Sequence, residues 1–238
     1  MQKELEVARH ELKYYISRSD YEYAHALLSE LMHHDSHQIE KEGYFIRSLY
    51  FDDMMENSVE EKLAGVEHRD KYRLRIYEFD QNWAKLERKR KNGNYVQKST
   101  GVITRKEAEE LIQGNHDILL NYKVHNLNSI YFDFKRKFLR PVVIVDYIRD
   151  VYMLDYNDIR ITFDKHLRAN DQNLDLFNPE IITEPLQRDE VIIMEIKFNH
   201  FLPPWFKDFL RFDSAMSSAI SKYCQCRMKT REFYYHHR

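Results

Sequence analysis

The sequence predicts an α+β fold in which β-strands close into a barrel and helices cover the outside of that barrel. Strand-like segments recur along the chain, and in most of them charged residues alternate with apolar ones. A strand of this kind has one charged face and one apolar face. The simplest closed arrangement places the apolar faces under the helices and the charged faces inward. No repeat of fixed period and no low-complexity linker divides the chain, so we expect one domain over residues 1–238.

The clearest pair of strands lies between residues 71 and 91. Their charged faces consist of Lys71, Arg73, Arg75 and Tyr77 in the first strand, and of Trp83, Lys85, Glu87 and Lys89 in the second. Like charges on one face of a sheet repel each other. Such a row of cations is therefore expected only where something negative neutralises it.

The other elements follow from the same periodicities. The predicted strands cover residues 9–16, 44–51, 71–77, 83–91, 95–99, 141–154, 159–164 and 191–198. The predicted helices cover residues 19–31, 52–65, 104–114, most of 117–139, 203–210 and a last segment that begins at Ser214 and carries Ser221 and Lys222. Residues 168–190 are polar and irregular, which indicates a long loop.

Capping and turn residues set several of these boundaries. Ser19 or Asp20 is suited to cap the first helix, and the capping box of Thr104 and Glu107 opens the third. Asn92-Gly93-Asn94 indicates a tight turn after the second cationic strand. A histidine group at residues 33–37 could form a metal cluster, but its spacing matches no zinc motif, so a solvated helix end is the favoured interpretation.

The overall composition excludes a basic nucleic-acid-binding chain. Lys and Arg number 37 and Asp and Glu number 39, which gives a formal net charge of −2. The positive charge is instead local, because residues 62–105 contain many more bases than acids. The five glycines make neither a P-loop nor a G-x-G-x-x-G turn. If the protein handles phosphates, side chains must bind them.

Three further features favour a cytoplasmic protein. The first ten residues are charged and lack the apolar core of a signal peptide. No apolar run approaches the length that spans a membrane. Cys224 and Cys226 are the only two cysteines and are too close for an easy disulfide, which indicates a reducing compartment.

The charged faces point to phosphate chemistry. A single alternating strand is more often one strand of a solvated sheet, but five or more with cations on one face favour a lumen. Arginine and lysine suit a chain of phosphates, and a few glutamates beside them could hold a divalent cation. The inward-facing set comprises Arg9, Glu11, Lys13, Arg73, Arg75, Lys85, Glu87, Lys89, Arg160, Glu195 and Lys197.

A series of short motifs in fixed order adds a family resemblance. They are RHELKYYI at residues 9–16, SLYFDD at 48–53, KYRLRIY at 71–77, LERKR at 86–90, YIR at 147–149, IRITFD at 159–164, MEIKF at 194–198 and SKY at 221–223. The set resembles the triphosphate tunnel metalloenzymes, and among them the polyphosphate polymerase domain of the vacuolar transporter chaperone (VTC) type. The resemblance implies a CYTH-like antiparallel barrel tunnel of about eight strands with flanking helices. It also implies transfer of the ATP γ-phosphoryl group to inorganic polyphosphate with Mn²⁺ or Mg²⁺.

The resemblance assigns roles by position. The implied catalytic cations are Arg73, Arg75, Lys89, Arg160 and Lys222. The implied substrate-binding residues are Lys13, Lys62, Lys98, Arg149, Lys197 and Ser221. The implied metal ligand is Glu195, with Glu87 and Glu11 as possible helpers.

The chain departs from the family pattern at three positions. Arg9 replaces the first glutamate of the superfamily's E-x-E-x-K, which favours a more cationic polymerase over a two-metal triphosphatase. Lys62 stands where the family may carry arginine, so charge is kept but the guanidinium fork is lost. Arg149 shares its strand face with Val143 and Val145, so it would need a bulge or a strand end to reach the lumen.

Two other functions stay open at this point. One is a hydrolase of the same fold that cleaves tripolyphosphate or a nucleoside triphosphate. The other is a non-catalytic module that binds polyphosphate or nucleic acid, although Tyr72 falls opposite Arg73 and so disfavours base stacking in RNA binding. The eukaryotic relatives suggest a membrane-protein partner that exports the product, and the sequence leaves the oligomeric state open.

Overall fold

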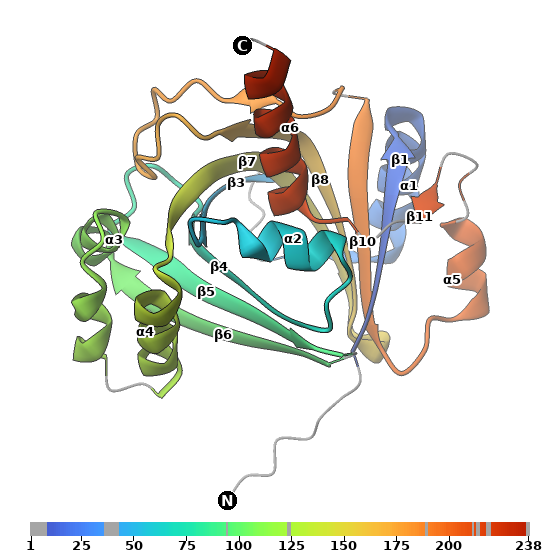
Figure 1. Cartoon of the computed structure of the whole chain (residues 1–238). Coiled ribbons are helices and arrows are strands. Elements are labelled where there is room, and N and C mark those ends of the chain that lie inside the picture. The colour runs from blue at the N-terminus through green and yellow to red at the C-terminus, as the bar shows by residue number, and fades with distance from the viewer. Residues whose placement is uncertain are drawn as a thin grey trace, which may run out of the picture. The chain divides into compact units, whose positions relative to one another are not determined.

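The computed structural model describes residues 9–35, 43–93, 95–122, 125–188, 190–210, 212, 215–217 and 220–236 (Figure 1). The chain divides into two compact units. The β1–β10 unit consists of Met1–Phe45, Tyr147–Leu167 and Gln187–Ile220. The β4–β6 unit consists of Ile46–Asp146, Arg168–Leu186 and Ser221–Arg238. Three strands contribute residues to both units, and the single domain stays a prediction of the sequence.

Eight strands of nine or more residues form the sheet in the described part of the chain. They are β1 (Arg9–Ser17), β3 (Tyr44–Asp52), β4 (His68–Ile76), β5 (Trp83–Asn92), β6 (Tyr95–Thr104), β7 (Arg140–Leu154), β8 (Ile159–Asn170) and β10 (Val191–Asn199). The two-residue strands β2 (His33–His34), β9 (Glu184–Pro185) and β11 (Met216–Ser217) add to them. The strand order is β11-β1-β10-β8-β7-β3-β4-β5-β6. The α+β class, the antiparallel pairing and the number of long strands are confirmed.

In the β1–β10 unit, one face of the strands packs against helices. Ser17 caps α1 (Arg18–Leu31) by accepting a hydrogen bond from the Asp20 N–H, so the predicted cap at Ser19 or Asp20 is displaced by two or three residues. The apolar residues of α1 and of α5 (Pro204–Phe209) share a core with Met194 and Ile196. Because side chains alternate along a strand, this core leaves Glu195 and Lys197 on the opposite face of β10.

In the β4–β6 unit, helices cover the apolar face of the strands. The covering elements are α3 (Arg105–Ile112), the 3₁₀ helix η1 (His116–Asn121) and α4 (His125–Lys137), seen beside β5 and β6 in Figure 1. The capping box of Thr104 and Glu107 is confirmed. Gly101 lets α4 approach β6, because a Cβ there would lie 2.6 Å from the Leu127 side chain. The helices α2 (Asn57–Leu63) and α6 (Lys222–His236) complete the unit.

Several predicted boundaries are wrong. The helix predicted from residue 52 begins at Asn57, because Asp52 is the last residue of β3. The last helix begins at Lys222, and Ser221 precedes it and accepts a hydrogen bond from the Cys224 N–H at 3.3 Å. The predicted helix start, Ser214, lies outside the described residues. The expected loop over residues 168–190 includes the end of β8 and strand β9. The short 3₁₀ turn η2 (Tyr156–Asp158) joins β7 to β8.

None of the helices in the described part of the chain combines the length and the apolar character that a membrane crossing requires.

Candidate functional site

Four charged side chains meet on the open face of the β1–β10 unit, and we name them the Glu195 cluster: Glu11, Lys13, Glu195 and Lys197. The antiparallel register places Glu11 opposite Lys197 and Lys13 opposite Glu195. Lys13 Nζ lies 3.5 Å from a carboxylate oxygen of Glu11 and 3.5 Å from one of Glu195. Lys197 contacts the same two carboxylates. Opposite charges therefore face each other across the two strands, which stabilises the pairing.

Glu195 is ionised at neutral pH although it is only 6% exposed. Burial by itself would raise the pKa of Glu195, but the charges of Lys13 and Lys197 outweigh burial and hold that pKa well below its usual value. A buried carboxylate with two flexible lysine partners is a group that can exchange those partners for a cation.

Arg149 reaches this face in a way that corrects the prediction. Its guanidinium forms a two-pronged ion pair with Asp164, with Nε and Nη2 at 2.6 and 2.8 Å from the two carboxylate oxygens. It also contributes to lowering the pKa of Glu195. Strand β7 runs without interruption through Arg149, and Ile144 belongs to the helix-covered apolar cluster, whereas Val143 and Val145 are also fully buried but are not part of that cluster. The valines, although apolar, share the face of Arg149, so neither a bulge nor a strand end is needed.

Arg160 also lies in the β1–β10 unit, where it is the register partner of Lys197. Its Nη2 lies 3.1 Å from Asp35, an ion pair that the sequence did not indicate. Arg160 and Lys197 line a cavity of about 140 Å³ near the start of β8.

A second group of charges lies in the β4–β6 unit, and we name it the Glu87 cluster: Arg73, Arg75, Glu87 and Lys98. Glu87 is 3% exposed and sits opposite Arg73 in the β4–β5 register. Its carboxylate is 2.5 Å from Arg73 Nε and 3.9 Å from Arg75 Nη1, and it also contacts Lys98 Nζ. Burial would raise the pKa of Glu87, but the three cations lower it far below the usual value. Burial lowers the pKa of Lys98.

Neighbouring strand β3 supplies residues that the sequence reasoning missed. Ser48 and Tyr50 pair in register with Arg75 and Arg73, and each contacts its partner's guanidinium, at 3.3 and 3.2 Å. The Tyr50 ring stacks on Tyr223 with centroids 5.1 Å apart. Strand alternation around Leu49 could have predicted that Ser48 and Tyr50 share a face. The sequence did not show that this face meets Arg73 and Arg75, because that depends on the register of β3 against β4.

The other predicted phosphate-binding residues of the β4–β6 unit lie outside the Glu87 cluster. Lys89 pairs in register with Lys71 and Lys98 and is exposed. Lys71 donates to Ser221 Oγ at 2.5 Å, so Ser221 lies beside the same row of cations. Lys222 is the first residue of α6, and Lys62 lies in the last turn of α2.

The predicted histidine cluster lies only partly in the described chain. His33 and His34 form β2, and His34 Nδ1 lies 3.3 Å from the Val151 carbonyl. His37 and the side chain of Arg9 lie outside the described residues.

The oxygen atoms around Glu195 fit a hard divalent cation. Glu11 and Glu195 share the contacts of Lys13 and Lys197, and Thr162 is the register partner of Glu195 on β8. Thr162 Oγ1 is buried and has no hydrogen-bond partner among the residues that the structure describes. Within the described residues no three His, Cys, Asp or Glu side chains converge as a metal site. Mg²⁺ and Mn²⁺ often use one or two carboxylates and complete their shell with water and substrate phosphates, which matches this donor set.

The family model of the VTC domain matches residues 8–230, and the chain belongs to that family. No curated relative matches the chain.

Solved structures show the fold. A Hippeastrum protein, HpAC1, described as a candidate adenylyl cyclase with a dominant triphosphatase activity, matches 92% of this chain and 95% of its own, with 15% identity and a TM-score of 0.54. A candidate adenylate cyclase from Bacillus halodurans is similar over 85% of this chain and 87% of its own, with 12% identity and a TM-score of 0.47. The chain thus has the fold of the triphosphate tunnel proteins, as the sequence predicted.

Proposed function

We propose that the protein is a metal-dependent polyphosphate polymerase that transfers the γ-phosphoryl group of ATP to a growing inorganic polyphosphate chain. The observation that carries the proposal is the Glu87 cluster. Three cations there surround one carboxylate, so the cluster keeps a surplus of two positive charges. Membership of the VTC domain family supports polyphosphate as the substrate that this surplus binds.

The geometry of the Glu87 cluster suits phosphate oxygens. Glu87, Tyr50 and Ser48 contact Arg73 and Arg75, so the guanidinium groups are held before a substrate arrives. Groups that are already oriented need little rearrangement when charge develops on the transferring phosphoryl group. Phosphoryl transfer depends mainly on such positioning and on electrostatic stabilisation, with little proton transfer by the protein.

The single channel that the sequence predicts would assign the metal ion of the reaction to the Glu195 cluster. Glu195 and Glu11 would hold the ion, and Lys13 and Lys197, displaced from these carboxylates, would be available to phosphate oxygens. A bound Mn²⁺ or Mg²⁺ neutralises phosphate charge and orients the phosphate chain. A single channel that collects both clusters stays a prediction of the sequence.

The test is incubation of the protein with ATP and Mn²⁺, followed by gel electrophoresis of the products and an orthophosphate assay. A polymerase makes long phosphate chains and ADP in step with each other. A product of orthophosphate alone, or no turnover despite tight binding, would contradict the proposal.

Hydrolysis is the second candidate, because the Hippeastrum protein that shares the fold is described with a dominant triphosphatase activity. In the same assay a hydrolase releases orthophosphate from ATP or tripolyphosphate and builds no chain. A binding module without catalysis would instead retain polyphosphate in a salt-sensitive and metal-independent way. The cytoplasmic location, the absence of nucleic-acid binding and a membrane-protein partner for product export stay predictions.

A further inference from the structure

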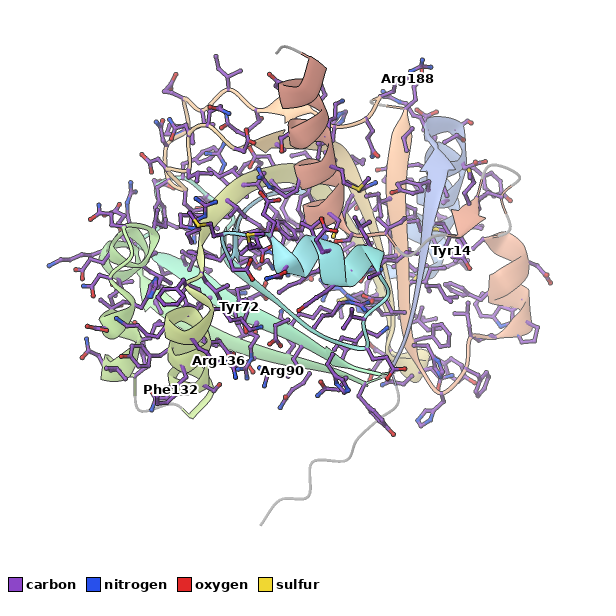
Figure 2. All side chains as sticks on the ribbon, viewed as in Figure 1. Tyr14, Tyr72, Arg90, Phe132, Arg136 and Arg188 are labelled. Atoms are coloured by element: carbon purple, nitrogen blue, oxygen red, sulfur yellow. The ribbon has the colours of Figure 1, made fainter. Side chains whose placement is uncertain are left out.

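A cavity of about 350 Å³ lies in the β4–β6 unit, and we name it the α4 pocket. The residues that matter to it are His68, Arg69, Asp70, Arg90, Arg136 and Lys137. Asp70 and Arg90 are register partners on β4 and β5, and Arg136 and Lys137 belong to the last turn of α4. Figure 2 shows Arg90 and Arg136 beside each other at the end of α4.

The α4 pocket and the Glu87 cluster lie on opposite faces of the same two strands. Tyr72, between Asp70 and Arg73, packs into the apolar core under α4. Because side chains alternate, Asp70 shares the face of Tyr72, and Arg73 points the other way. Arg69 has the parity of Arg73 but lies next to the start of β4 and still lines the pocket. The α4 pocket is therefore a site apart from the residues placed in the proposed reaction.

Positive charge exceeds negative charge around the α4 pocket. The Asp70 carboxylate forms ion pairs with Arg90 Nε at 2.7 Å and with Lys137 Nζ at 3.3 Å. The neighbouring Asp133 carboxylate forms ion pairs with Arg88 at 2.9 Å, Arg90 at 3.3 Å and Arg136 at 3.6 Å. Glu61 adds an electrostatic interaction with Lys137, and Arg69 adds a further cation. Arg88, Arg90, Arg136 and Lys137 pair with Asp70 and Asp133, and Glu61 acts on Lys137, whereas Arg69 donates to the Val66 carbonyl. Among these described side chains five cations stand against three carboxylates, which leaves a surplus of two positive charges.

The buried carboxylates hold the pocket's cations in place. Asp70 and Asp133 are 7% and 6% exposed, and the Tyr72 hydroxyl lies within 3.1 Å of both. Burial acts to raise the pKa of Asp70, but hydrogen bonds and charges from Arg90 and Lys137 lower it on balance, so the carboxylate stays ionised. The side chain of Arg136 is 74% exposed and that of Arg90 is 31% exposed, so both remain accessible to a ligand.

We propose that the α4 pocket binds a compact inorganic phosphate anion with at least two negative charges, of the size of pyrophosphate. The surplus of two charges matches such an anion, and arginine side chains bind phosphate oxygens in pairs. The lining is polar throughout and His68 is its one aromatic ring, so an inorganic anion fits better than a nucleotide base. The volume is at the lower end of the range for small-ligand sites.

Calorimetric titration with pyrophosphate, without divalent metal, tests the proposal. An Arg73→Ala background weakens binding at the Glu87 cluster and leaves the α4 pocket intact. We expect one equivalent to bind in this background. Adding Arg69→Ala and Arg136→Ala should weaken binding by about tenfold or more, since each change removes a charge-assisted contact. Adding Lys106→Ala and Arg140→Ala, which remove two exposed charges outside the pocket, should leave binding unchanged.

A second measurement does not depend on altered arginines. The imidazole resonance of His68, assigned by its loss in His68→Gln, should shift as pyrophosphate is added and should respond much less to sulfate at equal ionic strength. A His68 resonance that pyrophosphate does not move would overturn the proposal. Equal pyrophosphate affinity in the two triply altered proteins, the pocket variant and the control variant, would overturn it too.

Discussion

The Glu195 cluster and the Glu87 cluster are built in the same way but carry different charge. In each, a buried glutamate points away from the helix-covered face: Glu195 meets one lysine from its own strand and one from β1, whereas Glu87 meets cations from the two neighbouring strands β4 and β6. In the Glu195 cluster two lysines face two glutamates, so the charges balance. In the Glu87 cluster two arginines and a lysine face one glutamate, so a positive surplus remains.

The difference teaches how one sheet can present two kinds of phosphate chemistry. Lysine is a flexible point charge that can leave a carboxylate when a metal ion arrives, whereas an arginine fork stays in place once it is paired. A balanced group of lysines and glutamates therefore suits a metal ion. A group of arginines with excess charge suits the phosphate chain itself.

The largest expected loss of activity follows from a change in the Glu195 cluster. Glu195→Gln keeps the shape of the side chain but removes the charge that would hold the metal. We expect a loss of at least about 10²-fold in kcat for polyphosphate synthesis, the scale of removing one electrostatic group at a reacting centre. The measurement is chain synthesis from ATP at saturating Mn²⁺.

Manganese paramagnetic resonance distinguishes loss of metal from loss of fold. Glu195→Gln should bind Mn²⁺ more weakly than the unaltered protein, whereas Arg73→Ala should bind it as the unaltered protein does. Synthesis at the normal rate by Glu195→Gln would contradict the assignment of the metal to this cluster.

The next largest loss of activity is expected in the Glu87 cluster. Arg73→Ala removes a guanidinium that Glu87 and Tyr50 hold in place, and we expect about a 10²-fold loss of kcat/KM. Arg73→Lys is the matched control, because it keeps the charge without the fork, and should recover part of the loss. Equal activity of the alanine and lysine variants would mean that charge at this position does not matter.

Glu87→Gln is expected to separate stability from phosphate binding. It leaves three cations without their carboxylate and should lower the free energy of unfolding by about 3 kcal/mol at neutral pH. Phosphate affinity should not fall, because the positive surplus grows. Chemical denaturation and pyrophosphate titration measure the two effects. Retained stability, or a loss of phosphate affinity in a folded variant, would contradict this account.

The difference in stability between the unaltered protein and Glu87→Gln should depend on pH. The pKa of Glu87 is lower in the folded than in the unfolded chain, so the carboxylate stabilises the fold above its unfolded pKa of about 4.3. That stabilisation is lost as the pH falls through the folded pKa. The stability gap between the unaltered protein and Glu87→Gln should therefore narrow in denaturation experiments below about pH 4. A constant gap would show that the charge of Glu87 is not its source.

The smallest effect on the kinetics is expected for Lys98, the most exposed residue of the Glu87 cluster. The Lys98 side chain is 53% exposed, so solvent screens its charge more than those of Arg73 and Arg75. Lys98→Gln should raise KM for ATP by less than about tenfold with little change in kcat, and Lys98→Arg should behave almost as the unaltered protein. Steady-state kinetics measure the split, and a kcat loss as large as that of Arg73→Ala would place Lys98 at the reacting group.

Much of the site could be predicted because strand periodicity fixes which side chains share a face. Glu195 and Lys197 alternate with apolar Met194 and Ile196, and the structure places the two pairs on opposite faces. Arg149 was misjudged because valine was taken to mark the helix-covered face, whereas Val143 and Val145 lie opposite the core residue Ile144. The partners Tyr50, Asp164 and Asp35 were missed, because pairing between strands distant in the chain leaves no local pattern.

The sequence by itself determined the fold class, the alternation of charged and apolar faces and the concentration of cations in residues 62–105. These properties are local, because they depend on side-chain spacing and residue type along one segment. Only the tertiary structure decided which charge faces which: Lys13 opposite Glu195, Arg73 opposite Glu87, and Asp70 with Arg90 under α4. The physical reason is register, since one residue of slip between two strands would exchange every one of these partners.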